Sequence, residues 1–278
     1  MPNPLLVPRI RLHVPWAGTI RRGPDPPGSP STRIRQLPRM LMEWADRGSW
    51  RIVRAGRPDV VVGPQDVLVL LPETPHRMIG LGPAQWMTCW SLVEVDQGPG
   101  MPLLDQQAGL VVVPSARAGN LRRIMSSLAG TGDADERCSI RLQRQELGAA
   151  LVRELITLHP ELVIDRTDPR MGKLGDVAAF IESHLGDRLT RDGLARLAGL
   201  SPSRFHTVFV SAFGRSPMAH VLHLRLAKAC DLLVQDAVTG KEIAMRCGFS
   251  SQAHFCSLFR STFGVTPSDW VRSLHRSA

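Results

Sequence analysis

Two segments near the end of this chain repeat one another, and this repeat constrains the fold more than any other feature of the sequence. Residues 203–217 coincide with residues 253–267 after a shift of 50 positions. The shift aligns three phenylalanines, a glycine and a proline, as Phe205/Phe255, Phe209/Phe259, Phe213/Phe263, Gly214/Gly264 and Pro217/Pro267. Upstream, residues 190–201 coincide with residues 239–250 after a shift of 49. The chain therefore contains one supersecondary unit twice.

Each copy of the repeat predicts two short helices joined by a tight turn. A threonine precedes the first helix, a glycine makes the turn, and a second glycine ends the next helix, in the pairs Thr190/Thr239, Gly199/Gly248 and Gly214/Gly264. The phenylalanines fall on one face of the second helix, while small polar and basic residues fall on the other. This is the helix-turn-helix arrangement, and we expect the motifs at about residues 192–213 and 240–263.

A third helix is predicted between the two motifs. It starts at Ser216-Pro217 and runs to about Val234, and its ~18 residues span ~27 Å at 1.5 Å per residue. A rigid spacer of this length can hold two recognition helices about one DNA turn, ~34 Å, apart. A generic helical bundle is the alternative, but it explains the phenylalanines without explaining the caps and the glycine turns.

Residues 173–275 resemble the DNA-binding domain of the AraC/XylS family of bacterial transcription regulators. The first half of this resemblance lies in Leu194-Ala195, Ala198-Gly199-Leu200-Ser201-Pro202-Ser203 and Gly214-x-Ser216-Pro217. The second half lies in Ile243-Ala244, Gly248-Phe249-Ser250-Ser251-Gln252 and Phe263-Gly264-Val265-Thr266-Pro267. One departure is Trp270, which stands where the family usually has tyrosine; tryptophan keeps the aromatic anchor.

Outward positions near the start of each second helix are the candidates for contact with DNA bases. In the first motif these are Ser203, Arg204, His206 and Thr207, and in the second they are Gln252, Ala253, His254, Cys256 and Ser257. The family resemblance implies base contacts from Ser203, His206, Thr207, Gln252, Cys256 and Ser257. Arg260, together with Arg215, Arg225 and Lys228, is expected to contact phosphates, which positions a protein on DNA without specifying sequence.

The N-terminal part of the chain is predicted to be a small β-domain flanked by helices. Candidate strands are Ser49–Arg54, Val60–Val62, Val67–Leu71 and Gln85–Val95, separated by turn residues. Helices are expected at Ala118–Ala129 and Arg137–Leu158. We expect a flexible arm at residues 1–36, with a short strand at Leu5–Val14, followed by the β-domain with its helices at 37–160. A linker at 161–172 then leads to a DNA-binding domain at 173–275. The fold class is a multidomain α+β protein.

This β-domain is similar to the cupin-like sensor domains of the same family. The resemblance implies a β-barrel that holds a small effector, helices that form a homodimer, promoter DNA and RNA polymerase as partners, and activation as the commoner outcome. Aromatic walls with a few polar groups suit small ligands, and the candidate effector-binding residues are Trp44, Trp50, His76, Arg77, Trp86 and Trp90. Cupin metal sites need an HxH pair together with a carboxylate and a further histidine, and this region lacks that set, so we expect no metal and no cofactor.

Composition narrows the remaining function classes. The net charge of +9 suggests a polyanionic partner, although the basic residues are almost all arginine, a bias that genome composition alone can produce. Five cysteines without CxxC spacing indicate reduced thiols in a cytoplasmic protein. No apolar run is long enough to span a membrane, and no catalytic motif is present. A DNA-binding regulator is therefore expected, not an enzyme; a cupin-type enzyme, a DNA-repair fusion and a helical binding protein remain as alternatives.

Overall fold

The computed structural model describes residues 11–22, 36–82, 85–96, 103–105, 108–131, 138–163, 171–233 and 238–275. The chain divides into two compact units, which are described separately. The sheet unit holds residues His13–Glu94, Gln106–Leu162 and Ala253–Ala278, and the helical unit holds Val163–Gln252 with two shorter segments. This division groups the last two helices with the sheets, and the domain boundaries expected from the sequence stay predictions.

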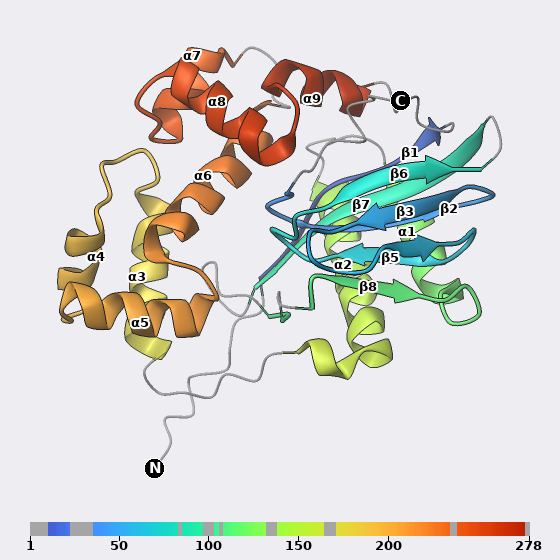
Figure 1. Ribbon diagram of the computed structural model, residues 1–278, viewed down its shortest axis with the longest axis horizontal. Coiled ribbons are helices and arrows are strands. Elements are labelled where there is room, and N and C mark those ends of the chain that lie inside the picture. The colour runs from blue at the N-terminus through green and yellow to red at the C-terminus, as the bar shows by residue number, and fades with distance from the viewer. Residues whose placement is uncertain are drawn as a thin grey trace. The chain divides into compact units, whose positions relative to one another are not determined.

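Two antiparallel sheets form the body of the sheet unit (Figure 1). The larger has the strand order β1-β7-β2-β5-β8 and the smaller has the order β4-β3-β6. The strands are β1 (Arg11–Arg22), β2 (Met40–Ala45), β3 (Ser49–Val53), β4 (Val60–Val62), β5 (Val67–Leu70), β6 (Arg77–Leu81), β7 (Trp86–Asp96) and β8 (Leu110–Val113). The antiparallel β-domain expected from the sequence is thereby confirmed.

Strand register determines which side chains lie between the sheets. Trp50 of β3 and Trp86 of β7 meet edge to face, with ring centroids 5.7 Å apart, so both rings belong to the interior. Because side chains alternate along a strand, Thr88 and Trp90 lie on the same face of β7 as Trp86. Their cross-strand partners Ala45 and Glu43 share that face of β2.

Four of the observed strands match the predicted ones, and the differences have identifiable causes. Strands β2, β6 and β8 were not predicted. Strand β2 is buried almost throughout, so it lacks the alternation that marks a half-exposed strand. The flexible arm expected over 1–36 was wrong for residues 15–22, because Arg11–Arg22 forms β1; the short strand expected at Leu5–Val14 overlaps the first four residues of β1. Since β1 is an edge strand, it accommodates Pro15, which has no N–H to donate. Residues 1–10 and 23–35 lie outside the described part.

Helices cover the other face of the larger sheet. They are α1 (Gly119–Ala129) and α2 (Cys138–Leu158), followed by the short 3-10 helix η3 (Pro160–Leu162), and they match the predicted ranges. Helix α1 buries Leu121, Ile124, Met125 and Leu128, which recur at helical spacing. Cys89 of β7 interacts with Ser126 of α1 and with Trp44 of β2, which places Trp44 on this helix-facing side.

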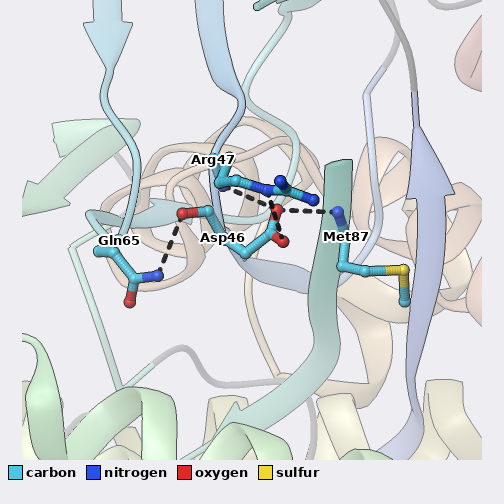
Figure 2. Close-up of polar contacts among 4 residues, drawn as sticks. All are labelled: Asp46, Arg47, Gln65 and Met87. Atoms are coloured by element: carbon cyan, nitrogen blue, oxygen red, sulfur yellow. Dashed lines mark hydrogen bonds and ion pairs between the residues drawn. The ribbon is translucent and has the colours of Figure 1, made fainter. Parts of the chain in front are cut away.

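A polar network joins the β2–β3 turn to the β4–β5 turn and to strand β7 (Figure 2). The Asp46 carboxylate accepts hydrogen bonds from the backbone N–H groups of Arg47 at 2.7 Å and Met87 at 2.9 Å. The Gln65 side chain donates to the Asp46 carbonyl oxygen at 3.1 Å. Arg122 of α1 in turn donates to the carbonyl oxygen of Gln65. These contacts hold the β2–β3 turn in place directly before Gly48, where the Trp86 ring packs.

The helical unit contains α3 (Met171–Ser183), α4 (Arg191–Leu197), α5 (Pro202–Phe213), α6 (Pro217–Leu233) and α7 (Gly240–Arg246). One hydrophobic core cluster of this unit includes Val177, Ile181, Leu194, Phe205, Phe209, Phe213 and Val221. Helix α6 lies where the spacer helix was predicted, between the α4–α5 pair and α7 (Figure 1). The chain continues into α8 (Gln252–Phe263) and α9 (Pro267–His275). Within the described ranges, no helix has the length and apolar composition that a membrane crossing requires.

Candidate nucleic-acid interface

The first motif is built from local hydrogen bonds that its sequence specifies. The Thr190 hydroxyl accepts from the backbone N–H of Gly193 at 3.1 Å and begins α4. Gly199 has a φ of +67°, a left-handed conformation that glycine adopts without strain. The next N–H, that of Leu200, donates to the carbonyl of Ala195 at 3.0 Å. The Ser201 hydroxyl then accepts from Arg204 N–H at 3.4 Å, and α5 begins.

The second motif repeats this geometry step by step. The Thr239 hydroxyl accepts from Glu242 N–H at 3.2 Å, and Gly248 has a φ of +72°. Phe249 N–H donates to the carbonyl of Ala244 at 2.8 Å, as Leu200 does to Ala195. Gly214 and Gly264 end their helices with φ values of +72° and +74°. The internal repeat seen in the sequence is therefore a repeat of backbone conformation.

The single extra residue of the second copy lies in the turn. Helix α5 begins directly after Ser201, whereas α8 begins two residues after Ser250, the residue that corresponds to Ser201. The shift between the copies changes from 49 to 50 at this point, as the sequence predicts. The insertion leaves the helices on either side intact.

Both second helices turn their phenylalanines inward and their polar residues outward. Phe205 and Phe255 are buried, and each packs against a further phenylalanine of its own helix. The predicted DNA-contacting residues are exposed, with the exception of the half-buried Cys256; they are Ser203, Arg204, His206, Thr207, Gln252, His254, Ser257 and Arg260. Their side chains are thus accessible for contact with a nucleic acid, and their individual roles stay predictions.

One of these side chains lies beside a glycine that the sequence analysis did not mention. A Cβ atom at Gly240 would lie 2.7 Å from Nε2 of Gln252. The absence of a side chain at the start of α7 therefore leaves the space that the Gln252 carboxamide occupies. No local pattern marks this role, because Gly240 otherwise resembles an ordinary residue at a helix start.

Beneath α5, His220 of α6 completes the packing of the first motif. It is 1% exposed, and its ring centroid lies 5.4 Å from that of Phe209 and 4.9 Å from that of Phe213. Burial holds the pKa of His220 well below its ordinary value, and the neighbouring His223 and Arg215 lower that pKa further. His220 is accordingly a neutral core residue of this motif at neutral pH.

Arg225, expected at a phosphate, occupies a different position. Its Nε donates to the carbonyl oxygen of Leu185 at 3.0 Å and its Nη2 donates to that of Asp187 at 2.7 Å. Both carbonyls belong to the loop between α3 and α4. The guanidinium therefore links α6 to this loop within the helical unit.

The six candidate effector residues do not gather at one place. Trp50 and Trp86 meet between the sheets, and Trp90 lies on the same face of β7. Trp44 faces the helices instead, and Arg77 lies on the outer face of the smaller sheet, opposite Met78. His76 is buried and its Nδ1 lies 2.8 Å from the carbonyl oxygen of Thr74. The interior set is therefore smaller than the predicted one.

Buried polar groups line this interior, and the sequence analysis did not single them out. Glu43 and Thr88 are 1% and 0% exposed. A carboxylate inside the apolar run Met40–Ala45 is the signal in the sequence that could have identified Glu43. Burial also raises the pKa of Cys89 to about 12 and that of Cys247 to about 11, so both are thiols at neutral pH. Nowhere in the described ranges do three His, Cys, Asp or Glu side chains gather closely enough to hold a metal ion.

Known sequences that are similar to this part of the chain include transcription regulators. Residues 194–273 match the family model of a helix-turn-helix domain. The HTH-type transcriptional regulator ArgR of Pseudomonas aeruginosa is 35% identical over 95 residues, which cover 34% of this chain and 29% of ArgR. The HTH-type transcriptional activator RhaS of Escherichia coli is 31% identical over 115 residues, 41% of each chain. The chain thus matches less than half the length of these relatives.

Solved structures extend the likeness to nearly the whole chain. ToxT from Vibrio cholerae aligns with a TM-score of 0.63 and 12% identity, covering 95% of this chain and 98% of ToxT. A second ToxT structure, with a bound unsaturated fatty acid, aligns with a TM-score of 0.59 and 13% identity over 94% of each chain. At this level of identity the likeness concerns the fold alone.

Proposed function

We propose that this chain, which carries an AraC-type helix-turn-helix domain at residues 194–273, is a sequence-specific DNA-binding transcription regulator controlled by a small molecule. The observation that carries the proposal is the repeat of one capped helix-turn-helix geometry, with both outward faces polar and exposed. The relatives named as transcription regulators match this same part of the chain. A helical protein without a DNA role would need neither the matched caps nor the matched turns.

Base readout is assigned to the exposed positions on α5 and α8. The Gln252 carboxamide is assigned to adenine, with which it can form two hydrogen bonds. Arg204 or His206 is assigned to the hydrogen-bond acceptors of guanine. Ser203, Thr207, His254, Cys256 and Ser257 complete the candidate surface, and Arg260 is assigned to phosphate contact.

Selection of bound sequences from a random duplex library tests this function directly, using the full chain. We expect a motif with two contacted patches about one helical turn, ~34 Å, apart. Recovery of a sequence-blind, salt-sensitive background alone would contradict the proposal. Metal analysis and substrate screening of the same preparation address the alternative of a cupin-type enzyme or a DNA-repair fusion.

The sheet unit is proposed to bind the effector between its two sheets. Trp50, Trp86 and Trp90 supply aromatic surface there, and Glu43 and Thr88 supply polar groups. The fold likeness to ToxT, which is solved with a bound unsaturated fatty acid, supports a ligand-binding role for a chain of this fold. An effector that binds here would shift the population of conformations that bind DNA. A thermal-shift screen that includes unsaturated fatty acids tests it, with Trp90→Ala expected to abolish the shift and the helix-facing Trp44→Phe to retain it.

Helix α2 is proposed to pair with its copy in a homodimer. Leu142, Glu146, Ala149 and Arg153 are all exposed and follow one another along one face of the helix, and Leu142 is 61% exposed. In an antiparallel two-fold pair centred on Ala149, Glu146 of one copy meets Arg153 of the other twice. Sedimentation of the full chain tests this: Glu146→Arg or Arg153→Glu alone is expected to weaken the dimer, and the double exchange to restore it.

The remaining assignments follow from the same function. Promoter DNA is the expected nucleic acid, RNA polymerase is the expected protein partner, and activation is the expected effect, as in RhaS by its name. The cytoplasm is the expected location, because RNA polymerase and promoters are found there. A transcription assay with purified polymerase separates activation from repression.

A further inference from the structure

The two turn glycines of the motifs have the same backbone conformation but different surroundings. Gly199 and Gly248 have φ values of +67° and +72°. A Cβ atom at Gly199 would meet no atom within 4 Å of it. A Cβ atom at Gly248 would lie closer than 3.0 Å to the carbonyl oxygen of Leu185 and 2.6 Å from Nη2 of Arg225. The turn of the second motif therefore packs against Leu185 and Arg225, whereas the turn of the first motif has free space around its glycine.

The group packed against Gly248 is the loop between α3 and α4, which leads into the first motif. Arg225 holds this loop from α6 through the carbonyls of Leu185 and Asp187. A second close approach lies beside it, because a Cβ atom at Gly186 would be 3.4 Å from the carbonyl oxygen of Arg246 at the end of α7. Backbone of the second motif thus meets backbone of the loop that leads into the first motif at two neighbouring points. All of these residues belong to the helical unit.

We propose that Arg225 is a positioning residue that holds the turn of the second motif against the α3–α4 loop and so sets the separation of the two DNA-reading helices. The reason is geometric. Helix α5 follows from the α3–α4 loop through α4, and α8 begins directly after the Gly248 turn. A planar guanidinium that donates to two carbonyls restrains direction as well as distance, which a single ammonium does not. This inference rests on the proposed DNA-binding function.

Binding of the full chain to three duplexes tests the proposal: the selected two-patch site, the same site with one patch scrambled, and the site with two base pairs inserted between the patches. For Arg225→Ala we expect about a tenfold or greater loss of affinity on the intact site, because a loosened second motif binds with a lower effective concentration. Affinity for the one-patch duplex is expected to stay within about twofold, since a single motif does not use the restraint. The inserted duplex is expected to penalise the variant less than the wild type.

Matched variants separate this role from charge and folding. Lys173→Ala removes one positive charge from an exposed position of α3, and it is expected to bind all three duplexes as the wild type does. Gly248→Ala is expected to mimic Arg225→Ala, while Gly199→Ala imposes the same backbone strain without the packing clash and keeps the spacing dependence. If Arg225→Ala does not fold, Arg225→Lys is measured on the same three duplexes in its place, because a single ammonium keeps the charge without restraining direction.

The outcomes distinguish a failure of the positioning role of Arg225 from a failure of the proposed DNA-binding function. Equal loss on the one-patch and two-patch sites, or unchanged tolerance of the insertion, overturns the positioning role while DNA binding stands. Absence of sequence-specific binding by the wild type overturns the proposed function and this inference with it.

Discussion

At the scale of single residues, His220 couples the stability of the first motif to pH. Neither ring nitrogen has a hydrogen-bond partner among the described residues, and burial keeps the folded-state pKa well below 6.5. The unfolded chain therefore binds a proton at His220 that the folded chain does not, so its stability contribution is present above pH 6.5 and is lost as pH falls below it.

Replacing His220 by leucine removes the buried ring nitrogens that have no hydrogen-bond partner in the described part of the chain, and it removes the group that binds a proton only in the unfolded chain. We expect His220→Leu to raise the free energy of unfolding by ~1 kcal/mol, because it replaces a buried polar ring whose nitrogens are unsatisfied, and to flatten the decline below pH 6.5. Urea denaturation of the full chain at pH 8 and pH 5.5 measures both effects. His206→Leu, at an exposed position of α5, is the control and is expected to change neither. A decline that persists in His220→Leu would show that other groups cause it.

Gly48 is a second residue whose role comes from what surrounds it. A Cβ atom there would lie closer than 3.0 Å to the rigid Trp86 ring, which is 1% exposed and has little space to move. Gly48→Ala is therefore expected to cost ~1–3 kcal/mol through overpacking. Gly119→Ala, where no atom lies within 4 Å of the new Cβ, is expected to be neutral or stabilising at the first position of α1. Thermal denaturation followed by tryptophan fluorescence compares them, and equal effects would contradict the packing argument.

At the scale of elements, the helix caps determine where the motifs begin. Thr190, Ser201 and Thr239 each accept a hydrogen bond from the N–H group three residues later. Loss of the Thr239 hydroxyl leaves an N-terminal N–H of α7 without its acceptor.

Thr239→Ala is accordingly expected to lower the free energy of unfolding by ~1 kcal/mol, and Thr239→Ser to restore most of it. Circular dichroism during urea denaturation of the full chain reports the loss. The affinity for a one-patch duplex read by the first motif should not change, whereas that for the second patch should fall. Loss at both patches would show that the cap supports the whole helical unit.

The elements differ in how much of them the sequence predicts. The two motifs were predictable because capping threonines, turn glycines and helical spacing are signals within a few neighbouring residues. Strand β2 was not, because Met40–Ala45 is buried on both faces and shows no period. The carbonyl contacts of Arg225 join positions 40 and 38 residues apart, and no local pattern encodes such a contact. Trp44 was misplaced because composition does not reveal which face of a strand a residue occupies.

At the scale of the whole molecule, a net charge of +9 favours association with any polyanion, so specificity must come from a few positions. Salt dependence separates the two contributions. Each phosphate contact releases condensed counterions, which gives the logarithm of the binding constant a slope of about −0.9 per contact against the logarithm of salt concentration. A base contact leaves this slope unchanged and discriminates between base pairs.

Arg260→Ala and Gln252→Ala are the pair that tests this division on α8, where both side chains are exposed. Arg260→Ala is expected to weaken binding to all duplexes alike and to reduce the salt slope by about 1. Gln252→Ala is expected to keep the slope and to lose ~1–3 kcal/mol of discrimination at one base pair. Titration of the full chain against the selected site and its single-base variants, at several salt concentrations, measures both quantities. Uniform loss from both variants would mean that Gln252 is not a base reader, and the specificity of the second motif would then have to come from His254, Cys256 and Ser257.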